Sequence, residues 1–163
     1  MTGIDKLDIE HARFVEARDA LHEALLQSQA GSPWIVSVCG PSRVGKTRVI
    51  DSCVEVYGEC GGLSGKEILR VVSPKYLTGR ALPDACLESL GLRAAFYKNQ
   101  LQATQALVKA LARAETKLII FDETQHMIER SGSTSVRAAG DFLKTLFDEA
   151  RTSIALVGLP ELL

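Results

Sequence analysis

The chain has 163 residues, of which 46% are hydrophobic and 24% charged. This is the size of one domain and supplies enough apolar side chains for a core, so a disordered chain is excluded. The formal net charge of -1 also excludes the strongly basic balance of a simple nucleic-acid binder, although it leaves room for local basic patches.

The first third of the chain predicts a helix, a strand and a second helix. Residues 9–29 repeat apolar side chains at steps of three and four, which is typical of an amphipathic helix. Residues 34–39 (WIVSVC) are an uninterrupted apolar run and predict a strand covered on both faces. Residues 46–57 have helical spacing, with Gly58 as the expected C-terminal stop, and residues 58–65 (GECGGLSG) predict a loop.

The rest of the chain continues to alternate strands with helices. The predicted strands are EILRVV, KLIIF and SIALV, at residues 67–72, 117–121 and 153–157. The predicted helices cover residues 80–90, 99–113 and 136–150, and Leu101 and Leu111 are expected on one face of the second of these. Strands alternating with helices indicate βαβ units and an α/β fold with a mostly parallel sheet.

Directly after the first strand, residues 40–47 read GPSRVGKT and match the phosphate-binding P-loop pattern GxxxxGK[ST] between a strand and a helix. Glycines let such a loop fold tightly around an anion, and main-chain N–H groups at the helix start point at phosphate oxygens. Lys46 is expected to neutralise the β- and γ-phosphates, and the Thr47 hydroxyl to bind Mg²⁺. The predicted ATP-binding residues are Gly40, Pro41, Ser42, Arg43, Val44, Gly45, Lys46, Thr47 and Arg48.

A second constellation is LIIFDE, in which a buried strand ends on two carboxylates. By itself such an end is commonly solvated. Beside a P-loop it fits phosphoryl transfer, which needs one carboxylate near the metal and another that deprotonates the attacking water. We therefore expect Asp122 to bind Mg²⁺ and Glu123, pointing the opposite way along an extended chain, to activate water. In P-loop proteins with this acidic pair, a further strand lies between the P-loop strand and the carboxylate strand, and residues 154–157 are the candidate.

Other polar residues leave alternatives open. Gln125 and His126 either sense the γ-phosphate or have a structural role. Arg43 and Arg48 either reach phosphates or lie at the surface. Four further cations are expected to be solvated, although one or two of them suit contact with nucleic-acid phosphate or a neighbouring subunit's nucleotide; they are Arg130, Arg137, Lys144 and Arg151.

The four cysteines are spaced too widely for a CxxC pair or a disulfide framework, so reduced thiols and no zinc site are expected. Cys39 and Cys53 lie in apolar patterns that favour core packing. The sequence has neither a membrane-spanning apolar run nor a signal peptide at its start, which predicts a cytoplasmic protein without a membrane partner. The cysteines are Cys39, Cys53, Cys60 and Cys86.

These residues resemble the AAA+ ATPases of transposition, the TniB and TnsC group, with MuB and ExeA-like ATPases as more distant relatives. The resemblance runs over nearly the whole chain and rests on GPSRVGKT, VVSP, LIIFDETQHM, DFLKTLFDEA and SIALVGLPELL. It implies a P-loop NTPase of the ASCE/AAA+ type, a three-layer sandwich with a mostly parallel central sheet. The expected division is an N-terminal helical segment over residues 1–31 and a P-loop ATPase core over residues 32–163.

The same resemblance implies a function. The chain would bind ATP with Mg²⁺, assemble on double-stranded DNA as a homo-oligomeric ring or filament, and link a target-selector protein to a transposase. Two departures stand out. Relatives often end the fourth strand on a polar sensor of the γ-phosphate, where this chain has Val157, Gly158 and Leu159. They also continue into a fifth strand, an arginine finger and a helical lid, so we expect a shortened chain, or a protein that has lost these parts, with weak ATP hydrolysis of its own.

Two other functions remain open at this point. One is a replication-initiator-like or ExeA-like AAA+ ATPase, a loader or motor with the same core. The other is a nucleotide-switched scaffold that binds ATP, hydrolyses it negligibly and recruits proteins without contacting DNA.

Overall fold

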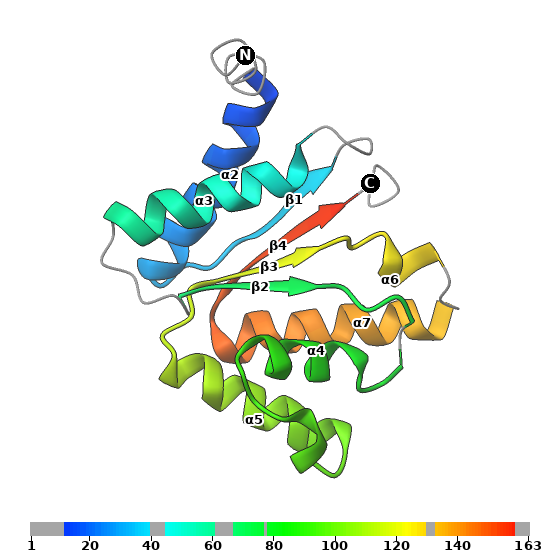
Figure 1. Ribbon diagram of the computed structural model, residues 1–163. Coiled ribbons are helices and arrows are strands. Elements are labelled where there is room, and N and C mark those ends of the chain that lie inside the picture. Colours follow the sequence, from blue (N-terminus) through cyan, green and yellow to red (C-terminus); the bar gives the residue numbers. More distant parts are fainter. Residues whose placement is uncertain (1–11, 40–44, 61–66, 77, 130–132, 159–163) are drawn as a thin grey trace.

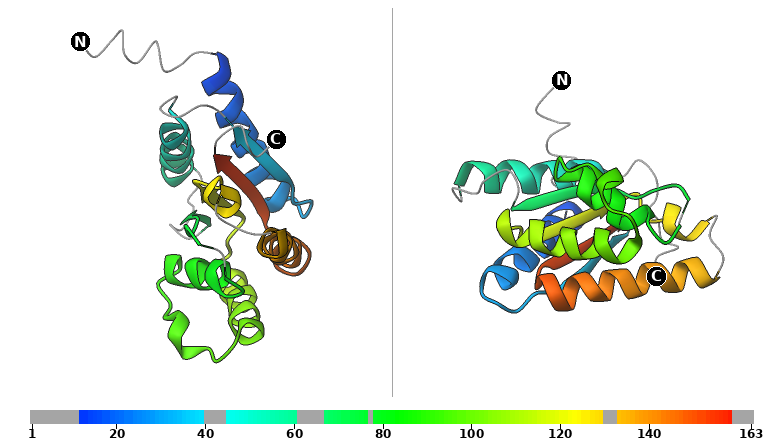
Figure 2. Two further views of the ribbon diagram at one scale, coloured as in Figure 1. Left: turned by 90° about the vertical axis from the view of Figure 1, so that its right-hand side faces the viewer. Right: turned by 90° about the horizontal axis from the view of Figure 1, so that it is seen from below.

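The computed structural model describes residues 12–39, 45–60, 67–76, 78–129 and 133–158. In these residues a sheet of four parallel strands lies between two layers of helices, as Figures 1 and 2 show. The strands are β1 (Ile35–Cys39), β2 (Ile68–Val72), β3 (Leu118–Asp122) and β4 (Ser153–Gly158). The helices are α2 (Ala12–Gln29), α3 (Lys46–Cys60), α4 (Ala81–Ser89), α5 (Gln100–Arg113), α6 (His126–Glu129) and α7 (Ser133–Thr145), with a 3-10 turn at Ala94–Phe96 and a π-helical turn at Leu146–Ala150.

The strand order is β1-β4-β3-β2. Strand β4 therefore lies between the strand that precedes the P-loop and the strand that ends on Asp122, which confirms the predicted position of the inserted strand. The central strands β3 and β4 are the most buried because each has a strand on both sides and helices on both faces.

Alternating side chains of the sheet form two apolar clusters. On one face Leu118, Ile120, Ala155 and Val157 pack with residues of α2 and α3. On the other face the neighbouring positions of the same strands pack with α4, α5 and α7. This is the period of two that a strand covered on both faces requires. The result is the three-layer α/β sandwich that the sequence predicts.

Strand β1 differs from its prediction. It is not covered on both faces: Val36 and Val38 pack against the α2 and α3 cluster, whereas Ile35 is 53% exposed and Ser37 is also exposed. In the described part of the chain β1 pairs with β4 alone, and no described helix covers its second face. An apolar run by itself cannot distinguish a central strand from an edge strand.

Two helices also differ from their predictions. Helix α3 continues through Gly58 to Cys60. A glycine inside a helix costs only about 1 kcal/mol, so it does not by itself end one. Helix α5 buries Ala103, Leu107 and Leu111, while Leu101 is 66% exposed. The small Ala103 allows close packing and defines the buried face with the residues four and eight positions later.

Other boundaries follow local chemistry. The Asn99 side chain accepts a hydrogen bond from the Gln102 N–H and caps the start of α5. Gly91, with φ of +84°, ends the segment of α4 as predicted. Among the described helices, none is both long enough and apolar enough to cross a membrane.

Candidate functional site

The candidate site lies at the carboxyl edge of the sheet, where parallel strands place all their C-terminal ends. Cys39, the last residue of β1, pairs with Gly158 of β4, and Asp122 of β3 pairs with Val72 of β2. The P-loop follows Cys39 directly. The fold therefore brings Cys39 and the acidic pair, which are about eighty positions apart in the sequence, to the same edge, which is where open α/β sheets bind ligands.

The described part of the P-loop is its last turn and the start of α3. Gly45 has φ of +89°, a conformation that only glycine adopts readily, and its carbonyl accepts the N–H of Val49 at 3.0 Å. Lys46 is half-buried at the first position of α3, and Thr47 and Arg48 are exposed. Five predicted ATP-binding residues lie outside the described residues; they are Gly40, Pro41, Ser42, Arg43 and Val44.

Lys46 also has an electrostatic effect at the end of β1. Burial raises the pKa of the Cys39 thiol above its usual value, and the nearby Lys46 ammonium opposes this rise because it favours the thiolate. The P-loop lysine is therefore close enough to the end of β1 to act on a side chain there.

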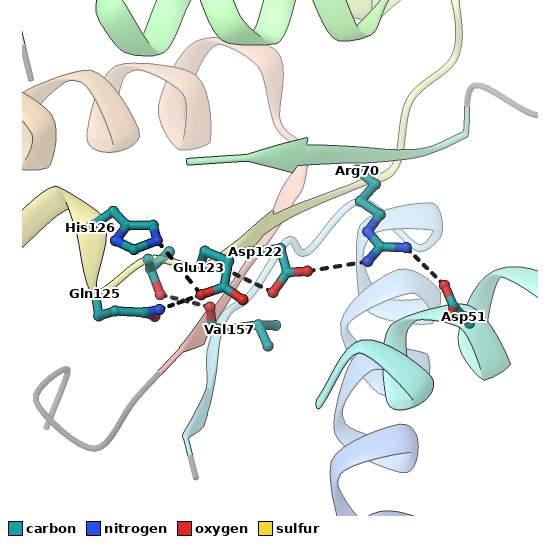
Figure 3. A network of polar contacts seen from close by, with 8 residues as sticks. Asp51, Arg70, Asp122, Glu123, Gln125, His126 and Val157 are labelled. Carbon is teal, nitrogen blue, oxygen red and sulfur yellow. Dashed lines mark hydrogen bonds and ion pairs between the residues drawn. The ribbon is translucent and has the colours of Figure 1, made fainter. Parts of the chain in front are cut away.

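The Asp122 carboxylate is almost fully buried, with 7% of its side chain exposed. Its Oδ1 atom accepts the N–H of Glu123 at 2.9 Å, and its Oδ2 atom accepts an N–H of the Arg70 guanidinium at 3.2 Å. A carboxylate offers about four lone-pair positions, so these two bonds leave acceptor capacity for a further ligand. Figure 3 shows the carboxylate between Arg70 and the Glu123 backbone.

Glu123 differs in conformation from the prediction. It does not continue the extended strand: the strand ends at Asp122, and Glu123 has φ of +57°, in the left-handed region. A residue other than glycine is held there at a cost of about 1–3 kcal/mol, and such residues cluster at functional sites. The direction of the Glu123 side chain is therefore set by a sharp turn and not by alternation along a strand.

The Glu123 carboxylate is 46% exposed and has two neighbours from the following turn. Its Oε2 atom accepts a hydrogen bond from the Gln125 side-chain amide and lies 3.8 Å from Nε2 of His126 (Figure 3). Gln125 is buried and His126 is half-buried at the start of α6. The turn that follows β3 thus holds the glutamate at the edge of the sheet by hydrogen bonding.

The end of β4 carries no polar side chain at Val157, in agreement with the sequence, and Leu159 lies outside the described residues. Instead, Thr124 provides a polar contact from the neighbouring turn. Its N–H and its hydroxyl both donate to the Val157 carbonyl, at 3.1 and 2.9 Å. This pair of bonds joins the turn that bears Glu123 to the end of β4.

The remaining candidate cations are peripheral. Arg137, Lys144 and Arg151 are exposed, as a solvated role predicts, and Arg130 lies outside the described residues. The described cysteines Cys39, Cys53 and Cys86 are free thiols, and Cys53 is fully buried in the core, which confirms its predicted role in packing.

Three polar residues of the site were not predicted from the sequence, namely Arg70, Asp51 and Thr124. Arg70 contacts Asp122 and also Asp51 of α3, at 2.8 Å. A signal was present in the strand sequence ILRVV, since a single cation in an otherwise apolar strand requires a charged partner or solvent. Which acid it contacts depends on the packing of α3 against the sheet.

The residues of the site fit a magnesium-bound nucleotide. Mg²⁺ prefers hard oxygen ligands, with one or two carboxylates and substrate phosphates. The described donors are the Thr47 hydroxyl and the buried Asp122 carboxylate, on the two elements that meet at this edge. The exposed start of α3 adds main-chain N–H groups that favour an anion.

The strand order, the P-loop between β1 and α3, and the acidic pair after β3 define a P-loop NTPase of the AAA+ type. Solved structures show the same fold. The Aeropyrum pernix ORC1 protein in complex with DNA matches with a TM-score of 0.64 and 22% identity, over 88% of this chain and 38% of that chain. Drosophila ORC bound to AT-rich DNA and Cdc6 matches with a TM-score of 0.55 and 16% identity, over 90% of this chain and 47% of that chain. This chain thus spans less than half the length of these two.

The family follows from the sequence itself. The model of the family described as "Bacterial TniB protein" matches residues 5–163. The chain therefore belongs to the TniB family. The comparison with curated protein sequences found no match.

Proposed function

We propose that this chain is the ATP-binding and ATP-hydrolysing regulatory subunit of a DNA transposition system. The observation that carries the proposal is the convergence of Lys46, Thr47 and Asp122 at one edge of an AAA+ sheet, in a chain of the TniB family. Its work is regulatory: the nucleotide state controls self-association on double-stranded DNA and the recruitment of a transposase and a target selector.

Each residue of the site has a chemical role in this proposal. The P-loop N–H groups and Lys46 bind the β- and γ-phosphates of ATP, and Thr47 and Asp122 hold the metal. When bound, Mg²⁺ neutralises the charge that develops on the phosphates. The Glu123 carboxylate accepts a proton from the attacking water. The contacts of Gln125 and His126 are both to the Oε2 atom of Glu123, so the half-exposed carboxylate keeps acceptor capacity for that water.

The proposed contact with DNA has separate support. Several of the matching solved structures have DNA bound, and the family is one of transposition. The likeness to ORC proteins also favours a replication-initiator-like or loader ATPase as a second candidate. It does so on the fold alone, whereas the family match favours transposition.

The test of the catalytic assignment is nucleotide binding and turnover by the intact chain beside Lys46→Ala and Glu123→Gln. We expect Lys46→Ala to weaken ATP binding by about ten- to a hundredfold, because a charge-assisted contact of about 1.5–3 kcal/mol is lost. We expect Glu123→Gln to bind ATP normally and to lose about 10²–10⁴-fold in turnover, the usual contribution of a general base. Titration calorimetry and phosphate release measure the two quantities.

Matched controls are Lys109→Ala and Glu88→Gln, which change exposed residues of α5 and α4 on the opposite layer. Both should leave binding and turnover unchanged. Normal turnover by Glu123→Gln would show that this glutamate is not the base. A wild-type chain that releases no heat with magnesium and ATP would refute the proposed function altogether.

A further inference from the structure

Neither the P-loop nor the acidic pair after β3 requires a cation at position 70, yet Arg70 lies there. It occupies the centre of β2, opposite Ile120 of β3, among four apolar residues. Strand alternation places it on the same face as Ile68, which packs with the α2 and α3 cluster. Its side chain therefore points to the layer that contains the P-loop helix, and 35% of it is exposed.

The guanidinium bridges two carboxylates from different elements. Its Nη1 atom lies 2.8 Å from Oδ1 of Asp51, and its Nη2 atom lies 3.2 Å from Oδ2 of Asp122, as Figure 3 shows. Asp51 is on α3, four residues after Thr47 and so on the same side of that helix. The bridge thus connects the helix that begins with Lys46 to the strand end that bears Asp122.

The two contacts have unequal electrostatic weight. The Asp51 side chain is 51% exposed, so its ion pair with Arg70 is screened by solvent. The Asp122 side chain is 7% exposed, and a buried carboxylate is costly without a paired charge and hydrogen bonds. Arg70 supplies Asp122 with a paired charge and with a hydrogen bond. The contact with Asp51 holds the Arg70 guanidinium in place. A planar guanidinium is suited to hold two acids at once, which a lysine ammonium on a flexible stem is not.

We propose that Arg70 is a positioning residue for the magnesium site. Anchored by Asp51, it fixes the orientation of the Asp122 carboxylate and the separation between that carboxylate and the start of α3, which bears Thr47. The Glu123 N–H fixes the other oxygen of Asp122. Two main-chain elements that supply the metal's ligands are thereby held in register before nucleotide binds. The inference rests on the proposed function, because it assigns a role toward Mg²⁺ and ATP.

The test compares ATP binding in the presence of Mg²⁺ with binding in EDTA, for wild type and Arg70→Gln. Partners that orient metal ligands typically change metal affinity by about 10–100-fold when they are lost. We expect Arg70→Gln to bind ATP in EDTA as wild type does, since the P-loop is intact, and to lose about tenfold or more of the enhancement that Mg²⁺ produces. A purely structural loss would weaken binding in both conditions equally.

Two further variants make the result specific. Arg70→Lys keeps the positive charge but lacks the planar guanidinium that contacts two carboxylates. It should recover part of the enhancement that Mg²⁺ produces. Arg80→Gln removes a similarly exposed arginine that pairs with Asp84 on α4, and should leave the enhancement unchanged. Melting temperatures in EDTA establish that each variant is folded.

Three outcomes would overturn the inference: an unchanged enhancement in Arg70→Gln, a full recovery in Arg70→Lys, or an equal loss in Arg80→Gln. If wild type itself shows no ATP binding with Mg²⁺, the proposed function fails as well. If wild type binds and Arg70→Gln binds equally, the inference alone fails.

Discussion

Asp122 and Glu123 are adjacent carboxylates with opposite environments. Asp122 ends a strand with 7% of its side chain exposed and has both oxygens hydrogen-bonded, whereas Glu123 is 46% exposed in a left-handed turn. The Asp122 carboxylate is bonded through both of its oxygens, whereas the contacts of Glu123 with Gln125 and His126 are to Oε2 alone. This difference suits the division of roles that we propose, because a metal ligand needs a fixed orientation and a general base needs access to water.

A second residue-scale consequence concerns Cys53, which is fully buried in α3. Burial raises the pKa of its thiol from 9.0 to about 11, because the thiolate is poorly solvated there. The folded state therefore keeps the thiol proton over a pH range in which the unfolded state loses it. Stability from this group is fully present below pH 9 and is lost as the pH rises toward 11.

We predict that the free energy of unfolding falls more steeply above pH 9 in wild type than in Cys53→Ala. The thiol contributes up to about 1.4 kcal/mol per pH unit in that interval. Urea unfolding at several pH values between about 8 and about 10.5 measures how the free energy of unfolding depends on pH in each protein. The buried Cys86 is present in both proteins, so the difference between them isolates Cys53. Parallel slopes would show that the Cys53 thiol ionises in the folded state as readily as in the unfolded chain.

At the scale of elements, helix α2 is packed into the ATPase fold. Leu21, Ala24 and Leu25 are fully buried in the cluster that also contains residues of α3 and β4. The Ser153 hydroxyl of β4 donates to the Ala24 carbonyl at 2.6 Å and accepts the Trp34 N–H at 2.9 Å. The boundary at residue 31 stays a prediction, and these contacts indicate that α2 and the sheet are stabilised together.

Helix α2 offers neighbouring leucines for a stability test. Leu25 has no exposed area, whereas Leu26 is 43% exposed. We predict that Leu25→Ala lowers the free energy of unfolding by about 2–5 kcal/mol, since it removes buried methyl groups and leaves a cavity. The matched variant Leu26→Ala should change it by about 0.5 kcal/mol or less, as is usual for exposed positions. Urea denaturation gives both values, and equal effects would show that α2 does not pack on the sheet as described.

At the scale of the whole molecule, charge constrains how the protein could bind DNA. A formal net charge of -1 provides no general attraction to phosphate. DNA binding by this chain therefore needs local basic groups, which several copies acting together would multiply. This requirement agrees with the proposal that nucleotide-dependent self-association and DNA engagement are coupled.

We predict that the wild-type chain with ATP, or a slowly hydrolysed analogue, shifts double-stranded DNA in a gel at low salt and loses affinity steeply at moderate salt. Binding that releases counterions from several phosphates typically weakens by about 10³–10⁵-fold between 50 and 200 mM salt. Lys46→Ala should lose the ATP-dependent part of the shift. A chain that binds ATP but produces no shift at any salt concentration would favour the nucleotide-switched scaffold.

The sequence alone determined the class of fold, and it predicts the chemistry of the phosphate loop. Strands such as LIIF can be predicted because buried parallel strands are uniformly apolar. The pattern GPSRVGKT between a strand and a helix can be predicted because its function depends on neighbouring residues alone. The position of β4 between β1 and β3 was also predictable once the acidic pair was recognised. The roles of Lys46, Thr47, Asp122 and Glu123 stay predictions that the variants above test.

Only the tertiary structure decided which surfaces are covered and which polar groups meet. The exposed face of β1 and the buried face of α5 depend on neighbouring elements. An apolar residue does not by itself specify the element against which it packs. The left-handed turn at Glu123 arises from hydrogen bonds to residues on β4 and on its own turn. In the Asp51–Arg70–Asp122 bridge, Asp51 is 19 positions and Asp122 is 52 positions from Arg70 in the sequence. Such contacts depend on how α3 and the sheet pack, which no local pattern encodes.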